Sequence, residues 1–219
     1  YYIISTYITL FILFNQTKNL KICWLTGIVK VVIIFTNNGL QRRINMMEAL
    51  IVVDIQEGLI NLGPANKENY IKKVKETISS FEEAGRDIIY IRHTESEGFL
   101  SEGDQSWLIY HELSPRPQDK IFNKNFNSIF KKTDVKAYLD SKGIKSYTMV
   151  GMQVEFCIDT SLKIGFEYGF EQVLVRDAVT TFDNNHLKAQ QIIDFYQDYI
   201  WNNRFAKVLD IEDVKKLLN

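Results

Sequence analysis

The sequence has 219 residues, of which 46% are hydrophobic and 24% are charged, and its formal net charge is −1. This is an ordinary globular composition, long enough for one sizeable domain, and its balanced charge gives no electrostatic footprint for nucleic acid. The two cysteines, Cys23 and Cys157, lie far apart. They exclude a disulfide scaffold and a cysteine-rich zinc site, and they favour a reducing cytoplasm.

Residues 1–46 differ in character from the rest of the chain. They contain two apolar runs, YYIISTYITLFILF and ICWLTGIVKVVIIF, each shorter than the roughly 20 residues of a membrane-spanning helix. No signal-peptide pattern is evident, and Met46 and Met47 come just before the first well-patterned strand. We expect residues 1–46 to be an upstream or non-native extension, with a membrane-associated segment as the alternative. Residues 47–219 should form a single domain without a membrane segment.

From residue 48 onward, strand and helix patterns alternate. The run ALIVVD is typical of a strand buried on both faces. Tyr70, Val74, Ile78 and Phe81 form one apolar stripe, which predicts a helix. The predicted strands are 49–54, 87–92, 120–123, 147–150, 172–176 and 207–209. The predicted helices are 66–84, 133–142, one that begins at about 154, 187–200 and 213–218. Thr133 is predicted to cap the second of these helices, and Gly85 and Gly143 to end the first and the second.

This alternation predicts an α/β fold with three αβα layers. Its sheet should be largely parallel and Rossmann-like, with about six strands and helices on both faces. Ligands of such sheets bind beyond the carboxyl ends of the strands. That rule selects the residues that follow the predicted strands, which are Asp54, Gln56, His93, Lys124, Gly151 to Cys157 and Asp177.

Cys157 falls in the first turn of a predicted helix, where unpaired backbone N–H groups favour a thiolate. Cys157 is therefore a candidate nucleophile, and the alternative is a small core residue. If Cys157 lies at a helix start near Lys124, we expect its pKa to fall below the free value of about 8.5. Asp54 could take the thiol proton and return it, and Lys124 could favour the thiolate. The alternative for Asp54 and Lys124 is an ion pair that braces the sheet.

Other motifs are weak or missing. The three histidines lack the spacing of a metal site, and GMQVEF lacks the GxGxxG pattern of a dinucleotide loop. Four aromatic residues could line an apolar pocket or belong to the core: Phe99, Trp107, Phe126 and Phe182.

The segments LIVVDIQEGL, IIYIRH, KNFNSIF, MVGMQVEFCIDTSLKIGFEYGF and VLVRDAVTTFD resemble the isochorismatase-like cysteine hydrolases, which include nicotinamidases and N-carbamoylsarcosine amidases. The resemblance places an Asp–Lys–Cys catalytic triad on Asp54, Lys124 and Cys157. It also implies an oxyanion turn at Gln153 and Val154, with a cis peptide bond between these two residues. The stretch RHTESEGF lacks the DxH of the nicotinamidase branch, so we expect neither a metal nor a cofactor. The form EFCIDTS favours a streptothricin-hydrolase-like branch.

The resemblance implies a metal-independent amidohydrolase that cleaves a small amide or related C–N bond through a covalent cysteine intermediate. Five further residues are expected to shape the substrate pocket: Gln56, His93, Trp107, Phe126 and Glu155. The alternative is a redox or small-ligand-binding protein of the same fold, because a thiolate at Cys157 would be oxidisable. We expect a cytoplasmic protein that binds a small-molecule amide and no nucleic acid, and that forms a homo-oligomer, either a dimer or a tetramer.

Overall fold

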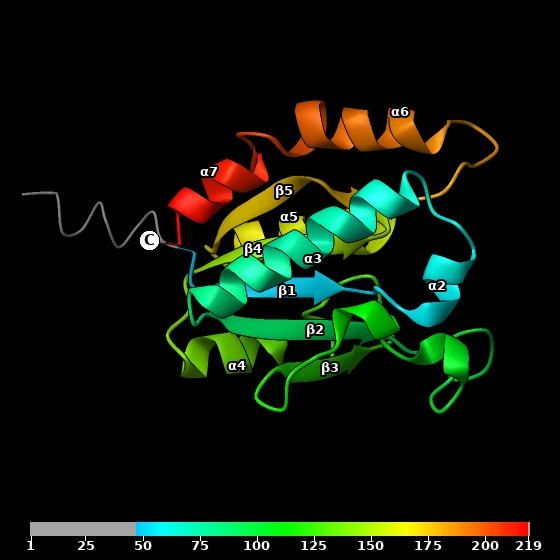
Figure 1. The fold of residues 1–219 in the computed structure, drawn as a ribbon, viewed down its shortest axis with the longest axis horizontal. Coiled ribbons are helices and arrows are strands. Elements are labelled where there is room, and N and C mark those ends of the chain that lie inside the picture. The colour runs from blue at the N-terminus through cyan, green and yellow to red at the C-terminus, as the bar shows by residue number, and fades with distance from the viewer. Residues whose placement is uncertain (1–46, 219) are drawn as a thin grey trace, which may run out of the picture. The chain divides into compact units, whose positions relative to one another are not determined.

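The computed structural model describes residues 47–218, which form an α/β structure around one parallel sheet of six strands (Figure 1). The sheet order is β3-β2-β1-β4-β5-β6, and every neighbouring pair is parallel. The strands are β1 (Ala49–Val53), β2 (Asp87–His93), β3 (Lys120–Lys124), β4 (Ser146–Met152), β5 (Glu171–Thr180) and β6 (Lys207–Leu209). The predicted fold class is confirmed.

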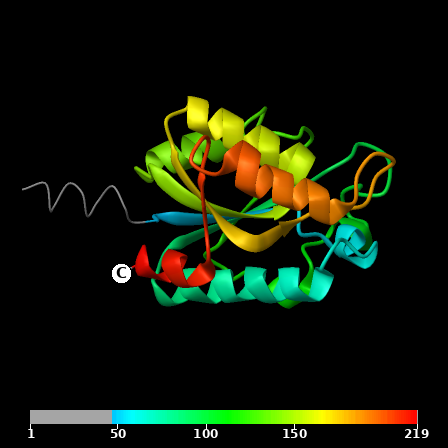
Figure 2. The same ribbon diagram turned by 90° about the horizontal axis from the view of Figure 1, so that it is seen from above.

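Helices cover both faces of the sheet, as the second view shows (Figure 2). One face carries α3 (Lys67–Glu83) and α7 (Ile211–Lys216), and the other carries α4 (Val135–Ser141), α5 (Asp159–Glu167) and α6 (Ala189–Asp194). The remaining elements are short: α2 (Glu57–Asn61), the 3-10 turns η1 (Gln105–Trp107) and η2 (His111–Leu113), and the π-helical turns η3 (Val154–Ile158) and η4 (Phe195–Trp201).

The sheet separates two hydrophobic cores, and the side chains of β1 alternate between them. Ala49, Ile51 and Val53 pack with α4, α5 and α6, whereas Leu50 and Val52 pack with α3 and α7. All five residues are buried. Successive side chains of a strand point to opposite faces, so a strand covered on both faces must be apolar at every position. The predicted stripe of α3 (Tyr70, Val74, Ile78 and Phe81) is also buried.

The prediction that a strand ends at Arg176 and that Asp177 follows it is wrong. A register shift in the pairing of β4 with β5 lets the strand continue to Thr180. Asp177 has a positive φ of 63° and donates its backbone N–H to Gln197 Oε1 at 3.2 Å. A β-bulge of this kind absorbs a polar residue without ending the strand, so Asp177 does not lie at the carboxyl edge.

Three helix boundaries also differ from the prediction. The N-cap of α4 is Asp134, because the Thr133 hydroxyl donates to the carbonyl of Ile129 instead of capping the helix. The helix predicted over 187–200 is divided into α6 and η4, and α7 begins at Ile211. No prediction covered α2, which is only 5 residues long.

The predictions for residues 1–46 lie outside the described residues. Within residues 47–218, no helix has the length and apolar character needed to cross a membrane.

Candidate active site

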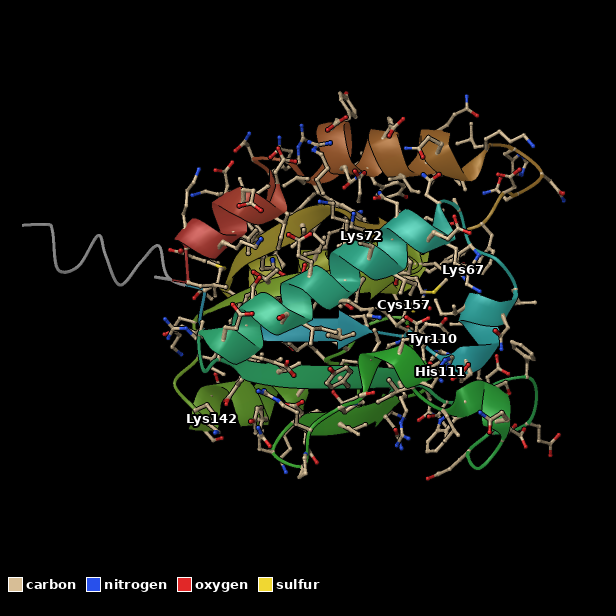
Figure 3. The ribbon with its side chains drawn as sticks, viewed as in Figure 1. Lys67, Lys72, Tyr110, His111, Lys142 and Cys157 are labelled. Carbon is tan, nitrogen blue, oxygen red and sulfur yellow. The ribbon has the colours of Figure 1, made fainter. Side chains whose placement is uncertain are left out.

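Asp54, Lys124 and Cys157 come together at the carboxyl edge of the sheet. Asp54 follows β1, Lys124 is the last residue of β3, and Cys157 lies in η3 after β4. The ammonium Nζ of Lys124 donates to Asp54 Oδ2 at 2.6 Å and to Cys157 Sγ at 3.2 Å. Asp54 is 2% exposed, Lys124 is 1% exposed and Cys157 is 8% exposed. Figure 3 shows Cys157 just beyond the end of β1, on the side of α2.

Lys124 reaches Asp54 across the intervening strand β2. In the parallel register Lys124 pairs with His93, and Lys124 Nζ lies 3.2 Å from His93 Nδ1. One ammonium therefore contacts a carboxylate, a thiol and an imidazole. The predicted ion pair between Asp54 and Lys124 is present, and it is part of this larger cluster.

The backbone at Asp54 is unusual. Asp54 donates its N–H to the carbonyl of Ile91 at 2.9 Å and has a φ of 54°, a left-handed conformation that is uncommon for residues other than glycine. Within the described chain, its Oδ1 atom is buried and has no hydrogen-bond partner. A buried carboxylate oxygen without a partner is costly, and such costs are concentrated at functional sites.

The turn that carries Cys157 depends on close contact between β1 and β4. Gly151 has a φ of +136°, and a Cβ there would lie 2.1 Å from the carbonyl oxygen of Val53. Only glycine allows this approach. The cis peptide bond joins Met152 to Gln153, so the prediction of a cis bond between Gln153 and Val154 is wrong by one position. The cis bond lies where the chain leaves β4, whereas the bond after Gln153 already enters η3.

Hydrogen bonds fix this turn on two sides. Ser161 Oγ donates to the Cys157 carbonyl at 2.6 Å and accepts the N–H of Ile129 at 3.1 Å, which joins η3 to the segment after β3. Thr181 Oγ1 donates to Glu155 Oε2 at 2.6 Å, which joins η3 to the end of β5. The segments that carry Cys157 and Lys124 are thus tied together by buried polar contacts.

The expected low pKa of Cys157 is wrong. Burial and the Asp54 carboxylate raise the pKa of the thiol to about 12, and Lys124 lowers it by less. Lys124 is shared with Asp54 at the shorter distance of 2.6 Å, so the carboxylate offsets much of its field at the sulfur. Near pH 7, Cys157 is therefore a thiol.

The other two groups have pKa shifts that match this state. Burial lowers the pKa of Lys124, but Asp54 and Cys157 outweigh burial and leave the pKa raised. Burial and the Lys124 ammonium lower the pKa of His93. At neutral pH, the cluster therefore contains an ammonium and a neutral imidazole.

A cavity of about 230 Å³ opens beside the thiol. Its wall consists of Asp54, Leu59, His93, Glu95, Leu100, Asn127, Met152, Gln153, Phe156 and Cys157. Glu95 and Asn127 were missed in the sequence, although each follows a strand end by two or three residues. The rule that selected His93 and Lys124 would have found them if it had extended further into the loops.

Asp54, His93 and Cys157 also meet the basic geometric requirement for a metal site. One ligand atom from each residue lies within 4.8 Å of the other two. However, all three side chains contact Lys124 Nζ, at 2.6, 3.2 and 3.2 Å. The ammonium occupies the point where these ligands converge, so this cluster does not fit a metal ion while Lys124 is charged.

Comparison with known proteins assigns the family. A family model described as the isochorismatase domain matches residues 48–213. The chain belongs to the isochorismatase family. A crystal structure of an isochorismatase family protein has a TM-score of 0.69 and 28% sequence identity, over 74% of this chain and 97% of that chain.

Two curated relatives in the family are more distant. The chain is 26% identical over 143 residues to the uncharacterized isochorismatase family protein YddQ of Bacillus subtilis, covering 62% of this chain and 79% of YddQ. It is 23% identical over 140 residues to streptothricin hydrolase of Streptomyces noursei, covering 63% of this chain and 51% of that hydrolase. The resemblance to the isochorismatase family is confirmed.

The wall of the cavity beside Cys157 includes some of the predicted site residues and excludes others. Of the five predicted pocket residues His93 lines the cavity, but Gln56, Trp107, Phe126 and Glu155 are not among its wall residues. Gln153, which was predicted for the oxyanion turn, also lines the cavity. Gln56 is buried and donates through Nε2 to the carbonyls of His93 and Trp107 at 2.9 and 2.8 Å. Gln56 therefore fixes the backbone of His93 by hydrogen bonds to its carbonyl and its N–H.

The predicted aromatic pocket is not found. Trp107 is buried, donates through Nε1 to Thr94 Oγ1 at 2.8 Å, and stacks under the Arg92 guanidinium. Phe126 faces Lys131, whose Nζ lies 4.1 Å from the ring centroid. The aromatic residue in the cavity wall is Phe156, which is 49% exposed. The side chain of Val154 is buried in the core, so a role in the oxyanion turn is left to its backbone.

Proposed function

We propose that this isochorismatase-family protein is a metal-independent amidohydrolase, which cleaves a small amide or related C–N bond through a thioester on Cys157. The observation that carries the proposal is the set of contacts made by one buried ammonium. Lys124 Nζ bonds to both Asp54 Oδ2 and Cys157 Sγ, while Asp54 Oδ1 has no partner within the described chain. The Asp54 carboxylate is therefore available to accept a proton from the neighbouring Cys157 thiol.

The first half of the reaction begins from the thiol. Cys157 attacks the amide carbonyl as its proton passes to Asp54, so the thiolate forms only as it reacts. Backbone N–H groups at the start of η3, from Val154 onward, stabilise the developing oxyanion. Asp54 then gives the proton to the leaving nitrogen. The C–N bond breaks, which leaves a thioester and releases ammonia or an amine.

In the second half, water hydrolyses the thioester. Asp54 removes a proton from the water as the oxygen attacks, and the C–S bond breaks to give a carboxylic acid. Asp54 then returns that proton to the sulfur, which restores the thiol. Lys124 remains an ammonium throughout and stabilises negative charge on Asp54 or Cys157, because its pKa is raised in this cluster.

The raised thiol pKa argues against the redox alternative. Oxidation requires a thiolate that is populated and accessible. Cys157 is 8% exposed and has a pKa of about 12. The other alternative is a ligand-binding protein without hydrolysis, which differs from a hydrolase in binding small amides without turnover.

Cys157→Ala should abolish hydrolysis while the protein stays folded, because the substitution removes the nucleophile and leaves a small apolar side chain. The measurement is ammonia release from a panel of small amides, with thermal unfolding as the folding control. Cys157→Ser is the matched variant, since it replaces the thiol with a hydroxyl of similar shape. Retained turnover in the alanine variant would refute the mechanism. Binding without turnover in the native protein would favour the ligand-binding alternative.

The compartment and the assembly state stay predictions. We propose a cytoplasmic protein because the sequence has only two cysteines, far apart and outside any CxxC pair, a usage that fits a reducing compartment. A dimer or tetramer is the expected assembly, and its mass in solution would test it.

A further inference from the structure

The charges in the cavity wall do not balance. Asp54 is neutralised by Lys124 at 2.6 Å. His93 is uncharged near pH 7 because burial and Lys124 lower its pKa. Glu95 is the second carboxylate in the wall, and no lysine or arginine of the described chain forms an ion pair with it. The cavity beside Cys157 therefore has a net negative charge.

Glu95 is held in position by its own loop. Its Oε2 atom accepts the N–H of Leu100 at 3.1 Å, and its backbone N–H donates to the Leu100 carbonyl at 3.1 Å. These neutral contacts fix the carboxylate without neutralising it. The nearest arginine in the sequence, Arg92, is engaged elsewhere, because it stacks on Trp107 and donates to Asn123. Glu95 Oε1 has no hydrogen-bond partner in the described part of the chain.

We propose that Glu95 selects substrates with a positively charged group, such as an ammonium or guanidinium, a short distance from the amide that reacts with Cys157. This inference rests on the proposed function and specifies its substrate class. A half-buried carboxylate that lacks a cation partner gains one when a cationic ligand enters. An anionic substrate would instead meet a like charge, which disfavours binding.

The cavity volume and the apolar residues in its wall fit a short substrate. At about 230 Å³ the cavity is smaller than typical drug-sized sites of about 300–1,000 Å³. Leu59, Leu100 and Phe156 supply apolar contacts for a short carbon chain. Such a chain would place its cationic end at Glu95 and its carbonyl at Cys157.

The first test labels Cys157 with methanethiosulfonates, so it does not depend on hydrolysis. The 2-aminoethyl reagent is cationic and the 2-sulfonatoethyl reagent is anionic. In both cases the Cys157 thiolate attacks the sulfenyl sulfur, forms a mixed disulfide and releases methanesulfinate, while the thiol proton goes to solvent. Each rate at Cys157 is measured by peptide mass and divided by the rate of the same reagent with 2-mercaptoethanol. The thiol pKa affects both reagents equally and cancels in their ratio.

In the native protein the cationic reagent should react about tenfold faster than the anionic one, because a cleft of one sign concentrates counter-ions. Glu95→Gln should bring the ratio close to one. Glu97→Gln removes the same charge from an exposed site two residues away and should leave the ratio unchanged. A native ratio near one, or an equal effect of both substitutions, would overturn the proposal. If Glu95→Gln does not fold, the native ratio must still fall toward one in high salt.

The second test compares three small amides of similar length: β-alaninamide, butyramide and succinamate, which are cationic, neutral and anionic. The proposal expects kcat/KM to fall in that order, and the preference for β-alaninamide to be lost in Glu95→Gln. Hydrolysis of all three without this order would overturn charge selection and leave the amidohydrolase intact. If none is hydrolysed but the labelling ratio holds, charge selection at the cavity is supported and the hydrolase proposal is weakened.

Discussion

Lys124 is the residue on which the candidate site depends, because its ammonium contacts every other polar group of the cluster. It is 1% exposed and bonds to both the carboxylate and the thiol. Burial raises the pKa of Cys157 most, Asp54 raises it further and Lys124 lowers it. Each charge can be removed separately, so the balance can be measured.

Iodoacetamide should react slowly with Cys157 near pH 7 and faster as the pH rises. The thiol loses its proton only as the pH approaches about 12, so the thiolate fraction grows about tenfold per pH unit below that value. We expect no plateau between pH 7 and pH 9, measured as the alkylation rate of the Cys157 peptide. A plateau that begins near pH 7 would instead indicate the low-pKa thiolate that the sequence predicts.

Two substitutions should change this alkylation rate in opposite directions. Asp54→Asn removes the charge that raises the thiol pKa, so alkylation at pH 8 should accelerate even though hydrolysis is lost. Lys124→Met removes the charge that lowers the pKa, so alkylation should slow. Lys120→Met, at an exposed position of the same strand, is the matched control. Because Lys124→Met leaves Asp54 buried and unpaired, it should also destabilise the fold by about 3–5 kcal/mol, and only its folded fraction should be compared.

At the scale of elements, the junction of β1, β4 and η3 positions the nucleophile. Gly151 in β4 faces Val53 of β1 in the parallel register. The cysteine turn begins three residues later. π-helical turns are rare in proteins, and those that occur often lie at functional sites. The π-helical start of this helix therefore agrees with a role for Cys157 beyond packing.

Gly151→Ala should destabilise the protein by about 3 kcal/mol or more, because the new Cβ meets the Val53 carbonyl and the backbone conformation disfavours any side chain. Any protein that still folds should show a changed Cys157 alkylation rate, since β4 leads directly into η3. Urea unfolding provides the measurement.

Gly143→Ala is the control for this experiment. Gly143 has a φ of +70°, but a Cβ added there would meet no atom of the described chain within 4 Å. We expect a loss of only about 1–2 kcal/mol there, the penalty of a left-handed residue alone. Equal losses at Gly143 and Gly151 would mean that close packing against Val53 has no special importance.

At the scale of the whole molecule, residues 47–218 contain all six strands and supply side chains to the hydrophobic cores on both faces of the sheet. We therefore expect the chain shortened to residues 47–219 to fold alone with one cooperative transition, as small single domains usually do. Its Cys157 alkylation rate should equal that of the full chain, which is the control. Aggregation, or loss of the cooperative transition, would show that residues 1–46 are needed for the fold.

The sequence by itself determined the order of the elements, the parallel α/β fold and the candidacy of Asp54, Lys124 and Cys157 for the carboxyl edge; the strand order β3-β2-β1-β4 then brought them together. These features depend on local patterns: continuous apolar runs, one helical stripe and polar residues directly after strands. In a parallel sheet the carboxyl ends meet at one edge, so position in the chain made all three residues candidates for that edge. Their choice as an Asp–Lys–Cys set came from the resemblance to the family, because the same positional rule also selected Asp177, which lies inside β5.

Only the tertiary structure decided which groups face the cavity and which charge each one carries. Glu95 entered the wall and Trp107 did not, because loop hydrogen bonds direct these side chains and no periodic pattern encodes them. The thiol pKa rose rather than fell because it depends on burial and on charge distances between residues far apart in sequence. A helix start alone favours a thiolate, but burial beside a carboxylate outweighs that local effect.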